Sequence, residues 1–216
     1  MTSSFGPGMD SQATITEWNP PHRFSADSRD DMGPDDPTIA TEWIVEAKDG
    51  GTCVVRVVHS WFTSKDDWDE QFDGHTYGWI NFFRILRLYL EHFSAQPCAS
   101  IQVMGSSSKD TQAAWTDFTT ALGISGAEEG SAISSAAGAP ALTGRVEHAS
   151  PPEFPGLLVR VSEPAPGIAH LFALPMGETV YLSTRFFLFG ASAADAADRA
   201  GVAWQEWVQQ RFPMEQ

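Results

Sequence analysis

Residues 74–93 read GHTYGWINFFRILRLYLEHF, and they form the most apolar helical segment in this chain of 216 residues. Large apolar side chains recur there at the i, i+3, i+4, i+7 spacing of one helical face, namely Trp79, Phe82, Phe83, Leu86, Leu90 and Phe93. A narrow polar stripe remains, made of Asn81, Arg84, Arg87 and Glu91. The pattern predicts a helix that is buried over most of its circumference, as a core helix, a membrane element or the cover of a ligand cavity.

The membrane alternative conflicts with the polar stripe, because a membrane span tolerates few charged residues. The first twelve residues, MTSSFGPGMDSQ, lack the basic region and the apolar run of a signal peptide. Cys53 and Cys98 form neither a disulfide framework nor a metal-ligand spacing. We therefore expect a cytoplasmic protein.

Acidic residues dominate the charge of the chain. Lys and Arg number 13 against 28 Asp and Glu, which gives a formal net charge of −15. A field of that sign repels phosphate backbones and anionic lipid headgroups. We therefore expect neither nucleic acid nor a membrane as a partner.

The segment before the helix has the alternation of β-strands. Strands are predicted at 12–18, 22–28, 40–51 and 52–62, and Asp49-Gly50-Gly51 supplies hairpin-turn chemistry between the last two. One apolar face follows from the alternation, with Trp43, Val45, Cys53, Val55, Val57, His59 and Trp61. These residues predict an antiparallel meander whose apolar face receives the helix.

The second half of the chain begins with a predicted strand at 98–105 and a helix at 110–124, with Asp110 or Thr111 as N-cap and Gly123 as C-cap. Four strands are predicted at 144–149, 156–164, 167–175 and 178–190, and a helix at 191–212. This order repeats that of the first half. Pro20-Pro21 and Pro151-Pro152 also follow Ile15 and Val146 at the same offset, and such marks indicate an internal repeat.

Several short motifs resemble the START-like (SRPBCC) superfamily, in its bacterial branch named after the activator of the heat-shock-protein-90 ATPase. They are Glu17-Trp18 with Pro20-Pro21, Gly50-Gly51-Thr52, His59-Ser60, Gly78-Trp79 and Leu88-Tyr89-Leu90-Glu91. The resemblance covers roughly residues 5–95, and residues 97–213 resemble a diverged second copy. It implies an α+β helix-grip fold, in which an antiparallel sheet wraps around a long C-terminal helix.

Two tandem copies are expected from this resemblance. Residues 1–96 would form a partial START-like domain that lacks the first strand and the helical pair, and residues 97–216 a second, complete one. Family members have that strand and helical pair before the segment Phe5-Gly6-Pro7-Gly8. We expect either that the true start lies upstream of Met1, or that a partner chain, such as a second copy in a homodimer, covers the exposed sheet edge.

The helix-grip resemblance also implies an apolar cavity between sheet and helix. The candidate ligand-binding residues are Trp43, Val45, Val55, Val57, His59, Trp61, Trp79, Phe83, Leu86 and Leu90. His59 is the polar group that could orient a ligand or act as a general base, and a satisfied histidine at a strand end is the simpler interpretation. Equally, the aromatic residues could only fill a core.

No motif predicts a reaction. The chain has no G-x-S-x-G nucleophile elbow and no phosphate-binding loop, its histidines are scattered, and the carboxylates of KDDWDEQFD (65–73) lack the spacing of a calcium loop. We therefore expect no catalytic residue, metal or cofactor. The leading hypothesis is a non-enzymatic protein that binds a small apolar ligand. The alternatives are a protein-interaction or chaperone-associated module and a cavity enzyme, a cyclase or hydrolase that uses His59.

Overall fold

The computed structural model describes residues 2–4, 10–29, 38–62 and 69–214. The segment Phe5-Gly6-Pro7-Gly8 and residues 30–37 and 63–68 lie outside this part. By its internal contacts the chain divides into two compact units, Met1–Asp73 and Gly74–Gln216.

The first unit contains one antiparallel sheet in the order β1-β2-β3-β4-β5. Its strands are β1 (Thr2–Ser4), β2 (Asp10–Asn19), β3 (Arg23–Arg29), β4 (Thr38–Lys48) and β5 (Thr52–Phe62). The hairpin between β4 and β5 turns at Gly50 and Gly51, whose φ angles of 79° and 75° suit glycine. The predicted meander is confirmed, and β1 is an addition that the alternation did not predict, because three residues are too short for a pattern.

A β-bulge interrupts the pairing of β2 with β3. Ile15 pairs with Ala26 and Glu17 with Ser25, so Thr16 is the extra residue. The second unit also has a bulge, between its strands β8 (Thr143–Ala149) and β9 (Gly156–Glu163). There Val146 pairs with Val159 and His148 with Leu158, which leaves Glu147 as the extra residue.

The sheet of the second unit has six antiparallel strands in the order β6-β11-β10-β9-β8-β7. The further strands are β6 (Cys98–Ser107), β7 (Ala132–Ser134), β10 (Gly167–Met176) and β11 (Thr179–Phe189). The helices are α1 (Asp69–His92), α2 (Thr111–Leu122) and α3 (Ala193–Arg211). Helix α2 begins and ends as predicted, since the Asp110 side chain accepts a hydrogen bond from Ala113 N and Gly123 adopts the left-handed conformation.

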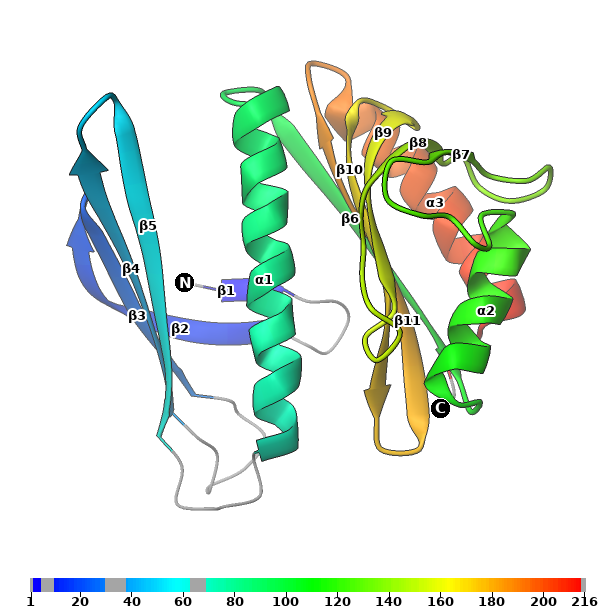
Figure 1. The fold of residues 1–216 in the computed structure, drawn as a ribbon, viewed down its shortest axis with the longest axis horizontal. Helices are drawn as coiled ribbons and strands as arrows, with labels where there is room; N and C mark the ends of the chain where they lie inside the picture. Colours follow the sequence, from blue (N-terminus) through cyan, green and yellow to red (C-terminus); the bar gives the residue numbers. More distant parts are fainter. Residues whose placement is uncertain (1, 5–9, 30–37, 63–68, 215–216) are drawn as a thin grey trace. The chain divides into compact units, whose positions relative to one another are not determined.

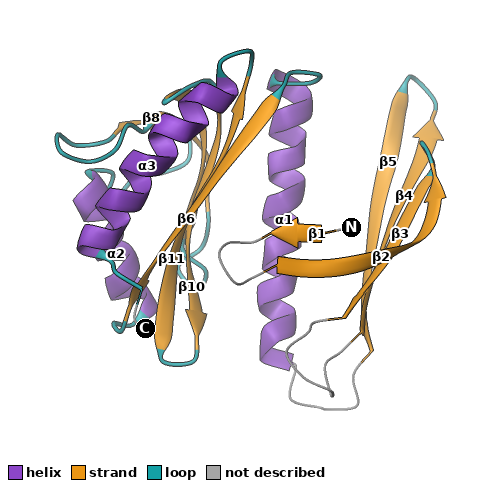
Figure 2. Ribbon diagram, turned by 180° about the vertical axis from the view of Figure 1, so that it is seen from behind, coloured by secondary structure: helices purple, strands orange, loops and turns teal. Residues whose placement is uncertain are grey.

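The C-terminal helix α3 lies along one face of this sheet, together with α2 (Figures 1 and 2). The core between them is closed around Trp204, Phe118 and Phe186, which are fully buried. The end of α3 is fixed to β6, because Ser106 N donates to Phe212 O at 3.1 Å and Ser106 Oγ donates to Pro213 O at 2.7 Å. An antiparallel sheet against a C-terminal helix is the α+β, helix-grip arrangement that we expected.

Helix α1 covers the opposite face of the same sheet (Figure 1). Ile85, Leu88 and Phe93 form an apolar cluster with Leu158, Ile168 and Phe189 of β9, β10 and β11. The rings of Phe93 and Phe189 stack at 4.6 Å between centroids. The middle strands therefore carry apolar residues on both faces, which explains why β9 reads as a continuous apolar run.

The buried face of α1 differs from the prediction. The helix begins at Asp69 rather than at residue 74. Within its described part, 78–92, the buried residues are Asn81, Ile85 and Leu88, and the buried Phe93 follows its last residue. Leu90 and Phe82 of the predicted face are 57% and 41% exposed. Aromatic residues surround most of this helix, so periodicity alone did not define which side of the helix packs against the sheet. That the first sheet wraps around α1, and that the chain divides into domains 1–96 and 97–216, stay predictions.

Candidate functional site

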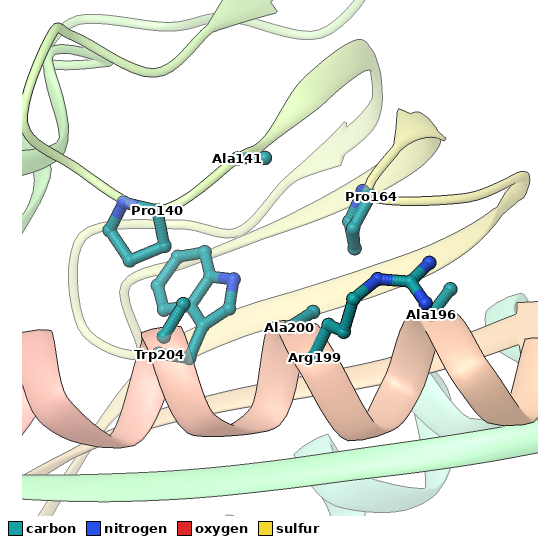
Figure 3. Close-up of a pocket in the computed structure, with 8 residues that line it drawn as sticks. Pro140, Ala141, Pro164, Ala196, Arg199, Ala200 and Trp204 are labelled. Carbon is teal, nitrogen blue, oxygen red and sulfur yellow. The ribbon is translucent and has the colours of Figure 1, made fainter.

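A candidate binding site lies beside α3, at the surface of the second unit. A pocket of about 220 Å³ opens there between one side of α3 and two loops (Figure 3). Its lining residues are Pro140, Ala141, Pro164, Ala196, Arg199, Ala200, Ala203 and Trp204. The volume is below the 300–1,000 Å³ that drug-sized ligands occupy, so the pocket fits a molecule of one or two rings.

Local sequence explains the hollow. The face of α3 toward the pocket carries alanines at 196, 200 and 203, whose short side chains leave space above the helix. Two prolines border the pocket from the opposite loops, Pro140 before β8 and Pro164 after β9. Proline lacks a backbone N–H, so these positions leave no donor to be satisfied at the pocket wall.

Trp204 provides the main polar feature of the pocket. Its side chain is fully buried, and its indole Nε1 has no hydrogen-bond partner. In Figure 3 the Nε1 edge of the ring faces the side on which Pro164 lies. A buried donor without an acceptor costs free energy, about 1–3 kcal/mol, so an unpaired indole N–H at a pocket wall is a notable feature.

Two further polar groups in the same core have no partner. They are Thr184 Oγ1 on β11 and Trp207 Nε1 on α3, and both residues are buried. Trp207 and Trp204 lie edge to face, with ring centroids 5.9 Å apart. The interior between the sheet and α3 thus holds donors that a ligand oxygen could satisfy.

Arg199 gives the pocket a charge. Its guanidinium stands among the lining residues, on the exposed side of α3. With an apolar floor, one buried indole N–H and one arginine, the pocket is suited to an apolar molecule that carries an oxygen acceptor.

The candidate residues of the first sheet come together as predicted by alternation. Trp43 pairs with Val57 and Val45 with Val55, and all four side chains are half-buried. Trp61 belongs to the same face by register, opposite Ile39, and its side chain lies outside the described part. The hydroxyl of Thr41 lies 2.9 Å from His59 Nδ1, which fits the simpler interpretation of a satisfied histidine.

The candidate residues of α1 are spread over its surface. Trp79, Phe83 and Leu86 are half-buried and Leu90 is exposed. A binding role for these ten residues stays a prediction. The pocket beside α3 was not predicted, and the alanines around Trp204 are the one feature of the sequence that could have indicated it.

Within the part of the chain that the structure describes, no group of three or more His, Cys, Asp or Glu side chains could hold a metal ion. Cys53 and Cys98 are free and exposed. Among the described helices, none combines the length and the apolar character needed to cross a membrane.

The fold and the pocket define an α+β protein with a helix-grip unit. No family model matches the sequence, and no curated protein matches it either. Two solved structures are similar to it. One is DynU16, a protein of the dynemicin biosynthetic locus, with 13% identity and a TM-score of 0.34. The other is the di-domain ARO/CYC BexL from the BE-7585A biosynthetic pathway, with 16% identity and a TM-score of 0.31. Each match covers 96% of this chain and 80% of the other.

One expectation is corrected by this comparison. The chain was predicted not to be an enzyme, because no catalytic motif was found. The matched BexL is described as an aromatase/cyclase, so the flat exclusion of enzymatic activity is wrong. Motifs could not have decided the point, because fold and activity are separable and the site chemistry can lie in scattered residues.

Proposed function

We propose that this protein binds a small, mostly apolar molecule bearing a carbonyl or similar oxygen acceptor, in the pocket beside α3. The unpartnered Nε1–H of buried Trp204 at the pocket wall is the observation that carries this proposal. An oxygen of the ligand accepts that hydrogen bond, and the alanine and proline walls enclose its apolar body. A slight outward movement of the loop at Pro140 or Pro164 admits the oxygen to the buried nitrogen.

Binding of acetophenone tests the proposal, with α-methylstyrene, its hydrocarbon isostere, as the matched ligand without an acceptor. We expect acetophenone to shift the indole ¹H–¹⁵N NMR resonance of Trp204, assigned by its loss in Trp204→Phe, and to bind that variant at least fivefold more weakly. Trp207→Phe is the matched control, because Trp207 is also a buried indole without a partner but does not line the pocket. Equal binding of both ligands, or equal binding to both variants, contradicts the proposal.

We also infer that residues 1–96 and 97–216 are diverged copies of one START-like domain, of the bacterial branch that the motifs resemble. The common strand order supports this inference, since β1 to β5 follow each other in one sheet as β7 to β11 do in the other. The bulges at Thr16 and Glu147 support it further, because both interrupt the second strand of the five, one residue after Ile15 and Val146. Bulges are position-specific features of a fold, so their agreement is more informative than the weak sequence identity.

A role in protein interaction is the second candidate function. Among the described strands, β5 pairs with β4 alone, whereas its counterpart β11 pairs with both β10 and β6. An open strand edge can pair with a strand of another chain, and a homodimer through β5 would bury it. Sedimentation of the full chain over a wide concentration range tests this candidate, and a monomer at every concentration contradicts it.

A further inference from the structure

The face of the second sheet that α1 covers carries a row of polar side chains that the proposed ligand pocket does not use. Strand register aligns His148, Leu158, His170, Arg185 and Gln102 across β8, β9, β10, β11 and β6. Directly opposed residues of antiparallel strands have Cβ atoms about 4.5–5.5 Å apart. The row therefore places His170 directly beside Arg185, and His148 two strands from His170, on a face that also carries the apolar residues Ile168 and Phe187.

Arg185 is the exceptional member of this row. Of the three half-buried arginines in the described ranges, Arg160 pairs with Glu147 at 2.7 Å and Arg84 donates to Asn81 Oδ1 at 3.1 Å. Arg185 has neither a carboxylate nor another hydrogen-bond acceptor among the described residues, and its partial burial lowers its pKa. Within the described ranges, this partly desolvated guanidinium therefore has no counter-ion.

Two further polar atoms on this face have no hydrogen-bond partner. They are the buried Ser183 Oγ, two residues before Arg185 on the same face of β11, and the buried Nε2 of His148, whose Nδ1 donates to Glu129 Oε2 at 3.2 Å. His170 is 8% exposed and its ring stacks on Phe172 at 4.6 Å. Desolvation, with the charges of Arg185 and His148, lowers the pKa of His170 to about 3, so this ring is neutral near pH 7.

We propose that this row is a second binding site, for a carboxylate attached to an apolar body. The carboxylate pairs with the guanidinium of Arg185 and accepts a hydrogen bond from Ser183 Oγ. Arg185 supplies one positive charge, which matches a monoanion better than a doubly charged phosphate. Ile168, Phe172 and Phe187 supply the apolar surface beside it. This site lies on the opposite face of the sheet from the pocket at Trp204, so neither proposal depends on the other.

Benzoate and its neutral isostere benzamide test the site on the full chain by isothermal titration at constant ionic strength, with inorganic phosphate as a third probe. We expect saturable binding of benzoate, at least tenfold weaker binding of benzamide and phosphate, and a loss of at least tenfold in benzoate affinity in Arg185→Gln. Arg56→Gln is the matched control, because it removes the same charge from an exposed strand position of the other unit. That variant keeps the affinity of the unchanged protein.

Two further variants separate the site from the pocket and guard against misfolding. Ser183→Ala keeps the arginine and loses severalfold in benzoate affinity. Trp204→Phe leaves benzoate affinity unchanged, and a loss there would assign benzoate to the pocket and overturn this proposal. Binding that is unaffected by Arg185→Gln, or equal binding of benzamide, overturns it as well, as does preferential binding of phosphate.

Discussion

His170 and Arg185 are direct register partners on β10 and β11, and they place a neutral ring against a guanidinium that has no counter-ion in the described part of the chain. The two residues lie on the α1 side of the sheet, in a row that also includes His148. A positive charge on His170 would be opposed both by burial and by these neighbours. This relationship makes the stability of the second unit depend on pH in a defined way.

Acidification is expected to destabilise the protein through His170. Its pKa falls from the ordinary 6.5 to about 3 in the folded state, so between these values the unfolded chain binds a proton that the folded chain does not. The contribution of the neutral ring is complete above pH 6.5 and is lost as the pH falls toward 3. The loss amounts to about 1.4 kcal/mol per pH unit.

Urea unfolding between pH 7 and pH 4.5 measures this effect. The slope of the unfolding free energy against pH reports how many more protons the unfolded chain binds than the folded chain. His170→Gln should lower this number by about one, whatever its effect on stability at pH 7. His92→Gln, which changes an exposed histidine of α1, should leave the slope intact. An unchanged slope in the His170 variant would show that the ring takes up its proton in the folded state.

Arg185→Met is expected to stabilise the protein without ligand. Methionine keeps the apolar stem and removes a partly desolvated charge that has no partner among the described residues, and such replacements are often stabilising by about 1–3 kcal/mol. Urea unfolding at pH 7 and low salt measures the change. Arg160→Met should act in the opposite direction, because it leaves Glu147 without the guanidinium that lies 2.7 Å away. Destabilisation by Arg185→Met would mean that the guanidinium has a partner.

The close approach of β6 to the end of α3 depends on Gly105. A Cβ at this position would lie 2.5 Å from Phe212 O and 2.8 Å from the Cβ of Phe212. Gly105→Ala must therefore displace the last turn of α3, and we expect a loss of about 1–3 kcal/mol. In Gly201→Ala the nearest atom is Ile101 Cγ2 at 3.7 Å, an ordinary contact, and the higher helix propensity of alanine should stabilise α3 by about 0.5–1 kcal/mol. Thermal unfolding measures both changes, and we expect a lower melting temperature for Gly105→Ala and a higher one for Gly201→Ala.

Strand and helix positions in this chain follow from local pattern to a large extent. The hairpin glycines, the Asp110 N-cap and the alternation of 52–62 each predicted what the structure has. The buried face of α1 was harder to predict. Trp79, Phe83 and Leu86 form one apolar stripe along the helix, and it is as pronounced as the stripe that contains Ile85 and Leu88. Which stripe meets the second sheet depends on residues far along the chain, and periodicity contains no such information.

The pocket and the polar row could not be predicted from the sequence, for a related reason. Trp204 and Pro164 come together only because β9 and α3 lie against the same core, 40 residues apart in the chain. His148, His170 and Arg185 looked scattered, and only strand register aligns them. A missing partner, such as that of Arg185, is a property of the folded chain, so no motif could have indicated it.

Leu88 and Leu90 test the orientation of α1 directly. Leu88 is 7% exposed within the cluster that includes Ile168 and Phe189, whereas Leu90 is 57% exposed. Leu88→Ala should cost about 2–4 kcal/mol through lost burial and the cavity that remains, and Leu90→Ala less than about 1 kcal/mol. Urea unfolding measures both. If Leu90→Ala were the more costly change, the helix would bury the aromatic stripe that its periodicity suggested, and its contact with β9, β10 and β11 would be wrong.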